Sequence, residues 1–323
     1  MTVSRMAAAA LRWSRWLGLD LLAPFYRFDR DIRQFTANCD TVPELLAKRA
    51  AEHPHATMLV APAADGSWTE WTFSDIDAQV DAVAAGLIAA GVRPGSIVAV
   101  MMPSSPAFVV TWLAVSRAGS TAALLGPHLR GASLAHCIGA CSATAAVIAR
   151  AFACDCAVTD VVASAVGLNA PLWVVGDSVG DLCDTHSKGG CGGGSSSETD
   201  KHTDECGGGC GATTPHDARF RDLDELYHMH RDAKPPPLSR EERKALHALM
   251  FTSGTTGMPK AVRISHVREA SGGMLFGQVV GLNQRDRVYT PFGLHHGTGS
   301  LILSIALYKG CAVVLPHRFS AGG

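Results

Sequence analysis

From position 41 onward, short apolar runs alternate with segments in which apolar residues recur every three or four positions. The runs 58–61, 97–102 and 145–148 are continuous and predict buried strands. Between Ser74 and Gly91 the spacing follows a helix instead, which we expect Ser74 to cap and Gly91 to end. This alternation is typical of an α/β fold, with a mostly parallel sheet flanked by helices.

Local end signals predict further elements. Thr41-Val42-Pro43-Glu44 is a capping box that opens a helix to about Glu52. The Asp65-Gly66 turn pairs the strand 58–61 with a strand at 68–73. After three prolines, structure resumes at Ser239-x-x-Glu242. Other helices are predicted at 108–118, from Ser133, at about 267–280 and at about 300–308, and other strands ending at Leu125 and at 288–290 and 312–315.

Residues 1–40 form an N-terminal leader. On a helical wheel its apolar side chains share one face and its arginines lie roughly opposite, with Met6, Ala10, Trp13, Leu17 and Leu21 against Arg5, Arg12 and Arg15. This pattern is typical of a helix in a membrane interface, so we expect residues 1–26 to contact a membrane surface. A transit peptide or a helix packed on the protein body fits the pattern as well, whereas secretion is disfavoured.

Between about 177 and 216 the sequence consists mainly of Gly, Ser, Thr, Asp and Cys, which predicts a disordered insert within a domain spanning 41–323. Cysteines and histidines in or beside this insert could bind zinc: Cys191, Cys206, Cys210, His186, His202 and His216. No Cys-x-x-Cys pair occurs among them, and a glycine-rich chain does not hold ligands in place. We therefore expect no metal site.

Composition excludes some classes of protein. A formal net charge of −1 over 323 residues gives no electrostatic basis for binding nucleic acid. No apolar stretch reaches the roughly 18 residues of a membrane-spanning helix. Several cysteines lie within or beside apolar segments, where a free thiol behaves as a small hydrophobic group, namely Cys137, Cys141, Cys154, Cys156 and Cys311. We expect a reducing, cytosol-facing location inside the cell.

The segment 252–260 is the most informative of the chain. Glycine lets the backbone turn its N–H groups toward an anion, hydroxyl groups donate to phosphate oxygens, and lysine adds a positive charge. Because the segment follows a strand, we expect it beyond the carboxyl ends of the sheet, where ligands bind in α/β folds. A polar surface turn is the alternative. The residues expected to hold a triphosphate are Thr252, Ser253, Gly254, Thr255, Thr256, Gly257 and Lys260.

The spacing Gly254-x-x-Gly257-x-x-Lys260 does not fit the P-loop of NTP hydrolases. The run resembles instead the phosphate loop of the AMP-forming acyl-activating superfamily. Three other stretches resemble the fatty acid transport protein / very-long-chain acyl-CoA synthetase branch: 108–119, Leu129-Arg130-Gly131 with Leu134, His136 and Cys137, and Arg318-Phe319-Ser320-Ala321. Pro127-His128 departs from the polar pair that is usual in this branch.

The segment 293–299 resembles the family motif in which an aromatic residue or a histidine lines the acyl pocket. His296 takes that place, and an imidazole there can bond the substrate carboxylate or gate the pocket. We interpret His295 as an ordinary residue. His266 matches a family position at the start of the following helix, where a structural role competes with a direct one.

The resemblance implies a two-step reaction that uses ATP, Mg²⁺ and coenzyme A. A long- or very-long-chain fatty acid becomes an acyl-adenylate and then an acyl-CoA, coupled to fatty acid uptake at a membrane. A ligase for another carboxylate, or a catalytically silent protein that binds lipid or membrane, is the alternative. Acyl chain length and oligomeric state stay open.

The family's adenine-contacting motif, its ribose-binding aspartate and its C-terminal lid with the adenylation lysine are not found up to Gly323. We therefore expect a truncated chain that contains an incomplete large N-terminal domain of the acyl-activating fold. We expect that this polypeptide by itself does not sustain full turnover.

Overall fold

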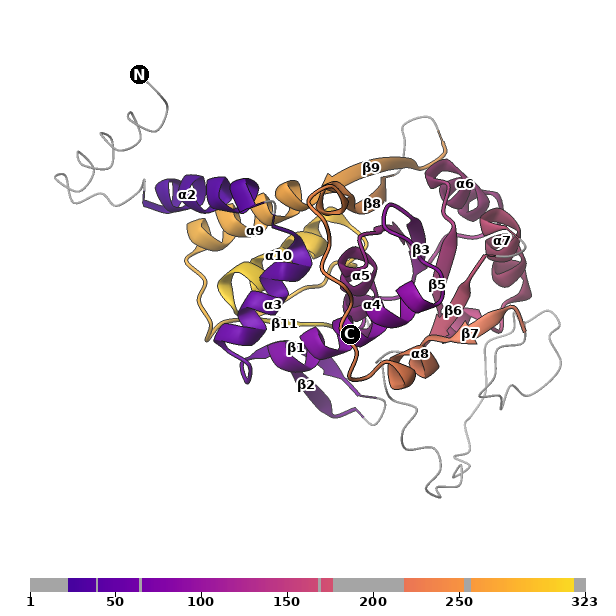
Figure 1. The fold of residues 1–323 in the computed structure, drawn as a ribbon, viewed down its shortest axis with the longest axis horizontal. Coiled ribbons are helices and arrows are strands. Elements are labelled where there is room, and N and C mark those ends of the chain that lie inside the picture. The colour runs from indigo at the N-terminus through magenta and orange to yellow at the C-terminus, as the bar shows by residue number, and fades with distance from the viewer. Residues whose placement is uncertain are drawn as a thin grey trace, which may run out of the picture.

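The computed structural model describes residues 23–38, 40–63, 66–167, 170–176, 218–252 and 257–316. In these ranges the chain forms a seven-stranded and a four-stranded sheet with helices packed around them (Figure 1). The predicted α/β class with mostly parallel strands is confirmed. The amphipathic face predicted in the leader and the insert at about 177–216 lie outside the described residues. No helix in the described ranges is long and apolar enough to cross a bilayer.

The larger sheet has the strand order β7-β6-β5-β3-β4-β8-β9, and its neighbouring strands are parallel except for β8 and β9. Every residue of β4 and β5 is buried, as their apolar runs predict. Because β3, β4, β5 and β8 are parallel, their carboxyl ends meet at one edge. The strands are β3 Ile97–Met101, β4 Thr121–Leu125, β5 Ala145–Ala149, β6 Leu172–Val175, β7 Phe220–Asp222, β8 Leu246–Thr252 and β9 Lys260–Ser265.

Helices cover both faces of this sheet, because successive strand side chains point to opposite sides. Val98 and Val100 of β3 share one core with α4 (Phe73–Ala89) and α5 (Pro106–Arg117). Ala99 and Met101 share the other core with α6 (Gly131–Cys141) and α7 (Cys156–Val166). The edge helix α8 (Leu223–Met229) joins the first core through Leu223 and Leu226.

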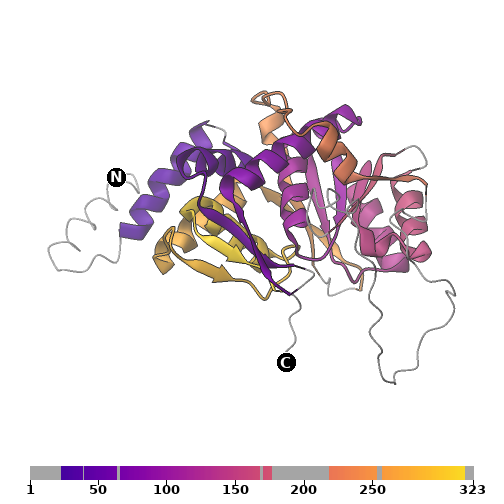
Figure 2. The same cartoon turned by 90° about the horizontal axis from the view of Figure 1, so that it is seen from below.

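The smaller sheet has the order β10-β11-β1-β2 and lies beside the larger one (Figure 2). The predicted pairing of β1 with β2 around Gly66 is confirmed, with an antiparallel register. β1 also pairs in parallel with β11, from the far end of the described chain. The strands therefore form two sheets and not the single sheet that we predicted. They are β1 Thr57–Pro62, β2 Trp68–Thr72, β10 Arg287–Tyr289 and β11 Ala312–Val314.

Helices α9 (His266–Val280) and α10 (Gly297–Lys309) pack against each other beside the smaller sheet. α2 (Ala23–Asn38) lies along α9 (Figure 1). Phe35 of α2 is buried against Ala270 and Met274 of α9. Residues 23–38 therefore form a helix packed on the protein body, which is one of the alternatives for the leader.

The helix-start signals were correct in kind, but two were misplaced. α6 begins at Gly131, with Arg130 as its N-cap residue, and not at Ser133. α3 (Val42–Glu52) begins with the predicted capping box at Thr41. For α4, however, the cap is Thr72 and not Ser74, because Thr72 and Asp75 exchange hydrogen bonds in both directions. Ser239 and Glu242 also exchange bonds, and they open the 3-10 turn Glu242–Lys244.

The sequence analysis predicted neither α7 and α8 nor β6 and β7. Both helices have side-chain caps, Asp155 for α7 and Asp222 for α8. The cysteine interpretation holds only in part. The thiols of Cys137, Cys141 and Cys311 are buried, whereas Cys154 and Cys156 are exposed, so these two are not small core residues.

Candidate functional site

The predicted phosphate loop joins β8 to β9. Thr252 and Lys260 stand opposite each other as the last register pair of the antiparallel ladder, and both are exposed. Gly257 has φ +105, a conformation that residues with a side chain rarely adopt. Ser253, Gly254, Thr255 and Thr256 lie outside the described residues. The described ends of the loop are thus brought together at the turn end of a hairpin.

This hairpin ends at the carboxyl edge of the larger sheet. β8 runs parallel to β4, with Leu124 beside Met250, so Thr252 lies at the same edge as Leu125. The segment 293–299 reaches this edge as well, because the Leu294 N–H donates to Ser104 Oγ at 2.9 Å, and Ser104 follows β3. The predicted phosphate loop and the predicted acyl-pocket segment therefore lie at one edge of one sheet.

His295 is the buried histidine of this edge. Its ring lies against Gly126, just after β4, where an added Cβ would be 3.6 Å from the imidazole. At Gly293 an added Cβ would overlap the His295 ring, so a larger residue there would require the ring to move. Burial lowers the pKa of His295 to about 4, and the nearby His296 and His128 act in the same direction. The ring is therefore neutral near pH 7, and its Nδ1 has no hydrogen-bond partner among the described residues.

His296 is exposed and precedes α10 as its N-cap residue. Its backbone carbonyl accepts from the Ser300 N–H at 3.0 Å, and its side chain makes no capping bond. The rings of His295 and His296 are 4.1 Å apart between centroids. Of the two imidazoles, His296 is the one that a ligand at this edge can reach.

His266 has a structural environment. It is the first residue of α9, is buried, and its Nδ1 accepts from the Val42 N–H at 3.1 Å, which ties α9 to the start of α3. Burial lowers the pKa of His266 to about 4, so the ring is a neutral acceptor. Its ring centroid is 5.1 Å from that of His247, which is buried on β8. These contacts favour the structural role over a direct catalytic one.

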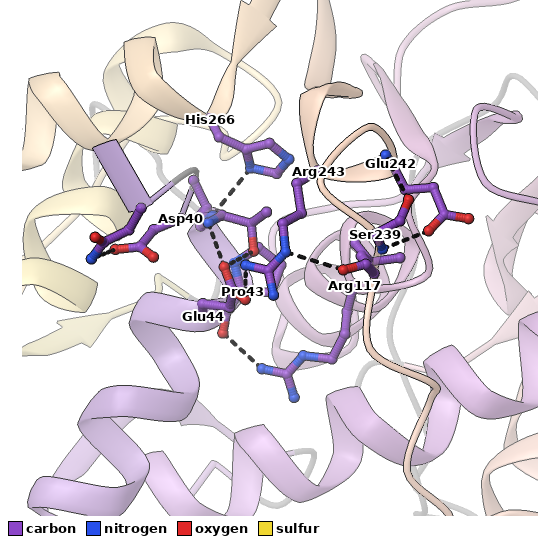
Figure 3. Close-up of polar contacts among 12 residues, drawn as sticks. Asp40, Pro43, Glu44, Arg117, Ser239, Glu242, Arg243 and His266 are labelled. Carbon is purple, nitrogen blue, oxygen red and sulfur yellow. Dashed lines mark hydrogen bonds and ion pairs between the residues drawn. The ribbon is translucent and has the colours of Figure 1, made fainter. Parts of the chain in front are cut away.

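The first turn of α3 contacts the segment that precedes β8 and the ends of two other helices (Figure 3). Arg243, just before β8, pairs with Glu44 and donates to the Leu238 carbonyl. Arg117, the last residue of α5, donates to the Pro43 carbonyl at 2.7 Å. The side chains of Arg243, Arg117 and His266 therefore all contact the first turn of α3. Because Arg243 lies just before β8, its ion pair with Glu44 helps to fix the start of the strand that carries Thr252.

Sequence reasoning missed the residues that line this edge from β3 and β4. Ser104 follows β3, and Gly126 and His128 follow β4. None of them belongs to a recognisable motif, and His128 was noted only because Pro127-His128 replaces the usual polar pair of the family. Their proximity to Leu294 and His295 arises from strand order, which local spacing does not reveal. A search for small or polar residues directly after each buried strand would have found them.

Comparison with known proteins agrees with this architecture. The sequence matches the family of AMP-binding enzymes over residues 46–321. The match spans most of the chain, so the chain belongs to the AMP-binding enzyme family.

The individual relatives include a fatty acid transport protein and a fatty-acid–CoA ligase. Long-chain fatty acid transport protein 1 of Bos taurus is 28% identical over 304 residues, 93% of this chain and 41% of that protein. Medium/long-chain-fatty-acid–CoA ligase FadD6 of Mycobacterium tuberculosis is 27% identical over 252 residues, 77% of this chain and 34% of that protein. The chain therefore spans less than half the length of either relative.

Among solved structures, a long-chain-fatty-acid-CoA ligase (FadD1) from Archaeoglobus fulgidus superimposes with a TM-score of 0.62 at 18% identity. The match covers 87% of this chain and 48% of that chain. This similarity supports the fold. The predicted resemblance to acyl-activating enzymes, and within them to fatty acid transport proteins and fatty acid–CoA ligases, is confirmed.

Proposed function

We propose that this chain binds ATP and takes part in the AMP-forming activation of a long- or very-long-chain fatty acid to acyl-CoA, coupled to fatty acid uptake. The observation that carries the proposal is the β8–β9 hairpin, whose loop ends Thr252 and Lys260 face each other at the carboxyl edge of the sheet. Membership of the AMP-binding enzyme family supports the nucleotide. Similarity to a long-chain fatty acid transport protein over 93% of the chain supports the fatty acid.

In this proposal the loop holds the β- and γ-phosphates of ATP. Lys260 is exposed at the first position of β9, so its ammonium group is available to a polyanion. Gly257 allows the backbone to turn where a side chain would strain it. Mg²⁺ arrives bound to the phosphates. The full set that we assign to the phosphates is Thr252, Ser253, Gly254, Thr255, Thr256, Gly257 and Lys260.

The chemistry requires no protein nucleophile. A carboxylate oxygen of the fatty acid attacks the α-phosphorus of ATP and pyrophosphate leaves, which gives the acyl-adenylate. The thiolate of coenzyme A then attacks the acyl carbonyl and AMP leaves. The protein contributes by positioning the reactants and neutralising phosphate charge. We assign His296 to the acyl pocket, where its exposed imidazole can donate to the carboxylate.

We also propose that the protein works at the cytosolic face of a membrane, which it contacts through residues 1–26. Phe25 and Tyr26, at the start of α2, are 52% and 42% exposed. Arg27 beside them is exposed as well. Aromatic rings next to a cationic side chain suit the interface of an anionic bilayer.

Calorimetric titration of the full chain with Mg-ATP tests the nucleotide assignment. We expect binding that Lys260→Ala weakens at least tenfold, because one charge-assisted contact to phosphate contributes about 1.5–3 kcal/mol. The matched control is Lys234→Ala, at an exposed lysine in the segment after α8, and it should bind as the unaltered chain does. Absence of binding, or equal losses in both variants, would refute the assignment.

Trapping of acyl-adenylate with hydroxylamine tests the substrate class. The assay reads only the first half-reaction and does not require full turnover. Palmitate and tetracosanoate should give hydroxamate, whereas anthranilate and aspartate should not. The reverse preference would establish a ligase for another carboxylate. ATP-independent lipid binding with no adenylate from any acid would establish a catalytically silent lipid-binding protein.

A further inference from the structure

The exit of the phosphate loop is held by a helix that the proposed chemistry does not use. Nε2 of His136, on α6, lies 3.1 Å from the carbonyl oxygen of Pro259. The two residues are 123 positions apart in the chain. Pro259 immediately precedes Lys260, the first residue of β9. The contact therefore joins α6 to the backbone that presents the lysine assigned to ATP.

Among the described residues, the register of β8 and β9 begins with the pair Thr252 and Lys260, so Pro259 lies just outside the ladder. Its carbonyl bond lies in the same rigid plane as the N–H of Lys260. A hydrogen bond to that oxygen consequently restrains the direction in which Lys260 leaves the loop. Pro259 has no N–H of its own, so this carbonyl is the polar backbone group of Pro259 that a neighbour can hold.

Helix α6, which carries His136, is anchored in the hydrophobic core. Leu134, Cys137 and Ile138 are buried in the core beneath it, together with Leu249 of β8. His136 stands off this stripe and is half-buried, so packing of the core does not account for an imidazole at this position.

We infer that His136 is a positioning residue for the phosphate loop, fixing the peptide plane from which Lys260 reaches the nucleotide. A carbonyl oxygen only accepts, so Nε2 of His136 carries the proton and donates. Both the neutral Nε2–H form and the imidazolium form can do so. This inference rests on the proposed function, because the loop is assigned to ATP there.

Substitutions at His136 test the inference in the full chain. Glutamine can place an N–H group at about the reach of Nε2, whereas alanine and leucine cannot. We expect His136→Ala and His136→Leu to weaken Mg-ATP binding by about three- to tenfold, the range that one neutral hydrogen bond supports. His136→Gln should stay within about twofold of the unaltered chain. His228→Ala, at an exposed histidine of α8, is the matched control and should change nothing.

Hydrogen exchange without nucleotide provides a second readout. Amides of residues 257–263 should exchange faster in His136→Ala than in the unaltered chain and His136→Gln, while thermal midpoints stay alike. Equal exchange in all forms, or weakening by glutamine as large as by alanine, would overturn the inference. If the unaltered chain binds no ATP, the proposed function is wrong, and exchange still decides whether His136 holds the loop exit.

Discussion

Glu269 is a carboxyl group buried between α9 and α10, 8% exposed. Burial raises its pKa to about 7, although a hydrogen bond with Ser300 and the charge of Arg268 act in the opposite direction. One of its oxygens, Oε1, has no hydrogen-bond partner among the described residues. Ser300 lies in the turn of α10 that follows His296, so this carboxyl group is close to the candidate site.

The raised pKa predicts a loss of stability with rising pH. Below pH 4.5 both the folded and the unfolded chain hold the proton, whereas between 4.5 and about 7 only the folded chain does. Unfolding therefore becomes easier across this window, by up to roughly 3 kcal/mol at about 1.4 kcal/mol per pH unit. Glu269→Gln should remove this dependence, so its stability relative to the unaltered chain should rise between pH 5 and pH 8.

Urea unfolding at both pH values provides the measurement. Glu241→Gln is the control, because Glu241 is a surface carboxylate paired with Lys244, with a side chain that is 79% exposed. A stability difference between Glu269→Gln and the unaltered chain that is the same at pH 5 and pH 8 would contradict the prediction.

At the scale of elements, the contact of α9 with α10 depends on glycines. At Gly273 an added Cβ would overlap the carbonyl of Ser304, and at Gly277 it would come within 2.7 Å of the Lys309 side chain. Ser304 Oγ also donates to the Glu269 carbonyl at 2.7 Å, which holds the helices at this short distance. α10 carries His296 as its N-cap, so the spacing of the two helices positions that imidazole.

Gly273→Ala should therefore destabilise the protein by about 1–3 kcal/mol, because the clash is with backbone that cannot turn away. Gly139→Ala is the matched helical control, since an added Cβ there meets nothing within 4 Å. It should stabilise by about 0.5–1 kcal/mol, through helix propensity. Thermal or urea unfolding distinguishes the two, and equal effects would show that the short helix distance is not required.

At the scale of the molecule, α2 and the end of α9 form an exposed apolar margin. α2 runs antiparallel to α9, because Phe35 packs on Ala270 while Asp31 accepts from Gln278. The start of α2 consequently lies toward the end of α9, away from the seven-stranded sheet (Figure 1). The exposed side chains of this margin are Phe25, Tyr26, Phe276, Val279 and Val280.

This margin predicts where the proposed membrane contact forms. Phe25→Ser combined with Phe276→Ser should reduce co-sedimentation of the full chain with anionic phospholipid vesicles at least fivefold, since each ring loses roughly 1.5–3 kcal/mol of apolar burial. Trp68→Ser is the control, because Trp68 is 56% exposed on β2, in the smaller sheet. Equal losses in both proteins, or no loss, would contradict a membrane contact at this margin.

Elements with local causes could be predicted from the sequence. Thr41 and Glu44 form their capping box within one turn. The continuous apolar runs of β3 and β5 favour burial whatever the order of the strands in the sheet. The hydroxyl- and glycine-rich loop between Thr252 and Lys260 likewise suits an anion by its own composition. The capping box and the two strands were predicted correctly, because they depend on interactions between residues that are near one another in the chain. The assignment of the loop to an anion stays a prediction.

Strand pairings and side-chain contacts between residues far apart in the sequence were decided only by the tertiary structure. Leu59 of β1 pairs with Val313 of β11, which makes a second sheet, and Val42 donates to His266, which makes that histidine structural. The burial of His295 against Gly126, and the reach of His136 to Pro259, likewise join segments far apart in the chain. Such pairs are selected when the whole core closes, because the free energy that orders them comes from packing the sheets and helices together.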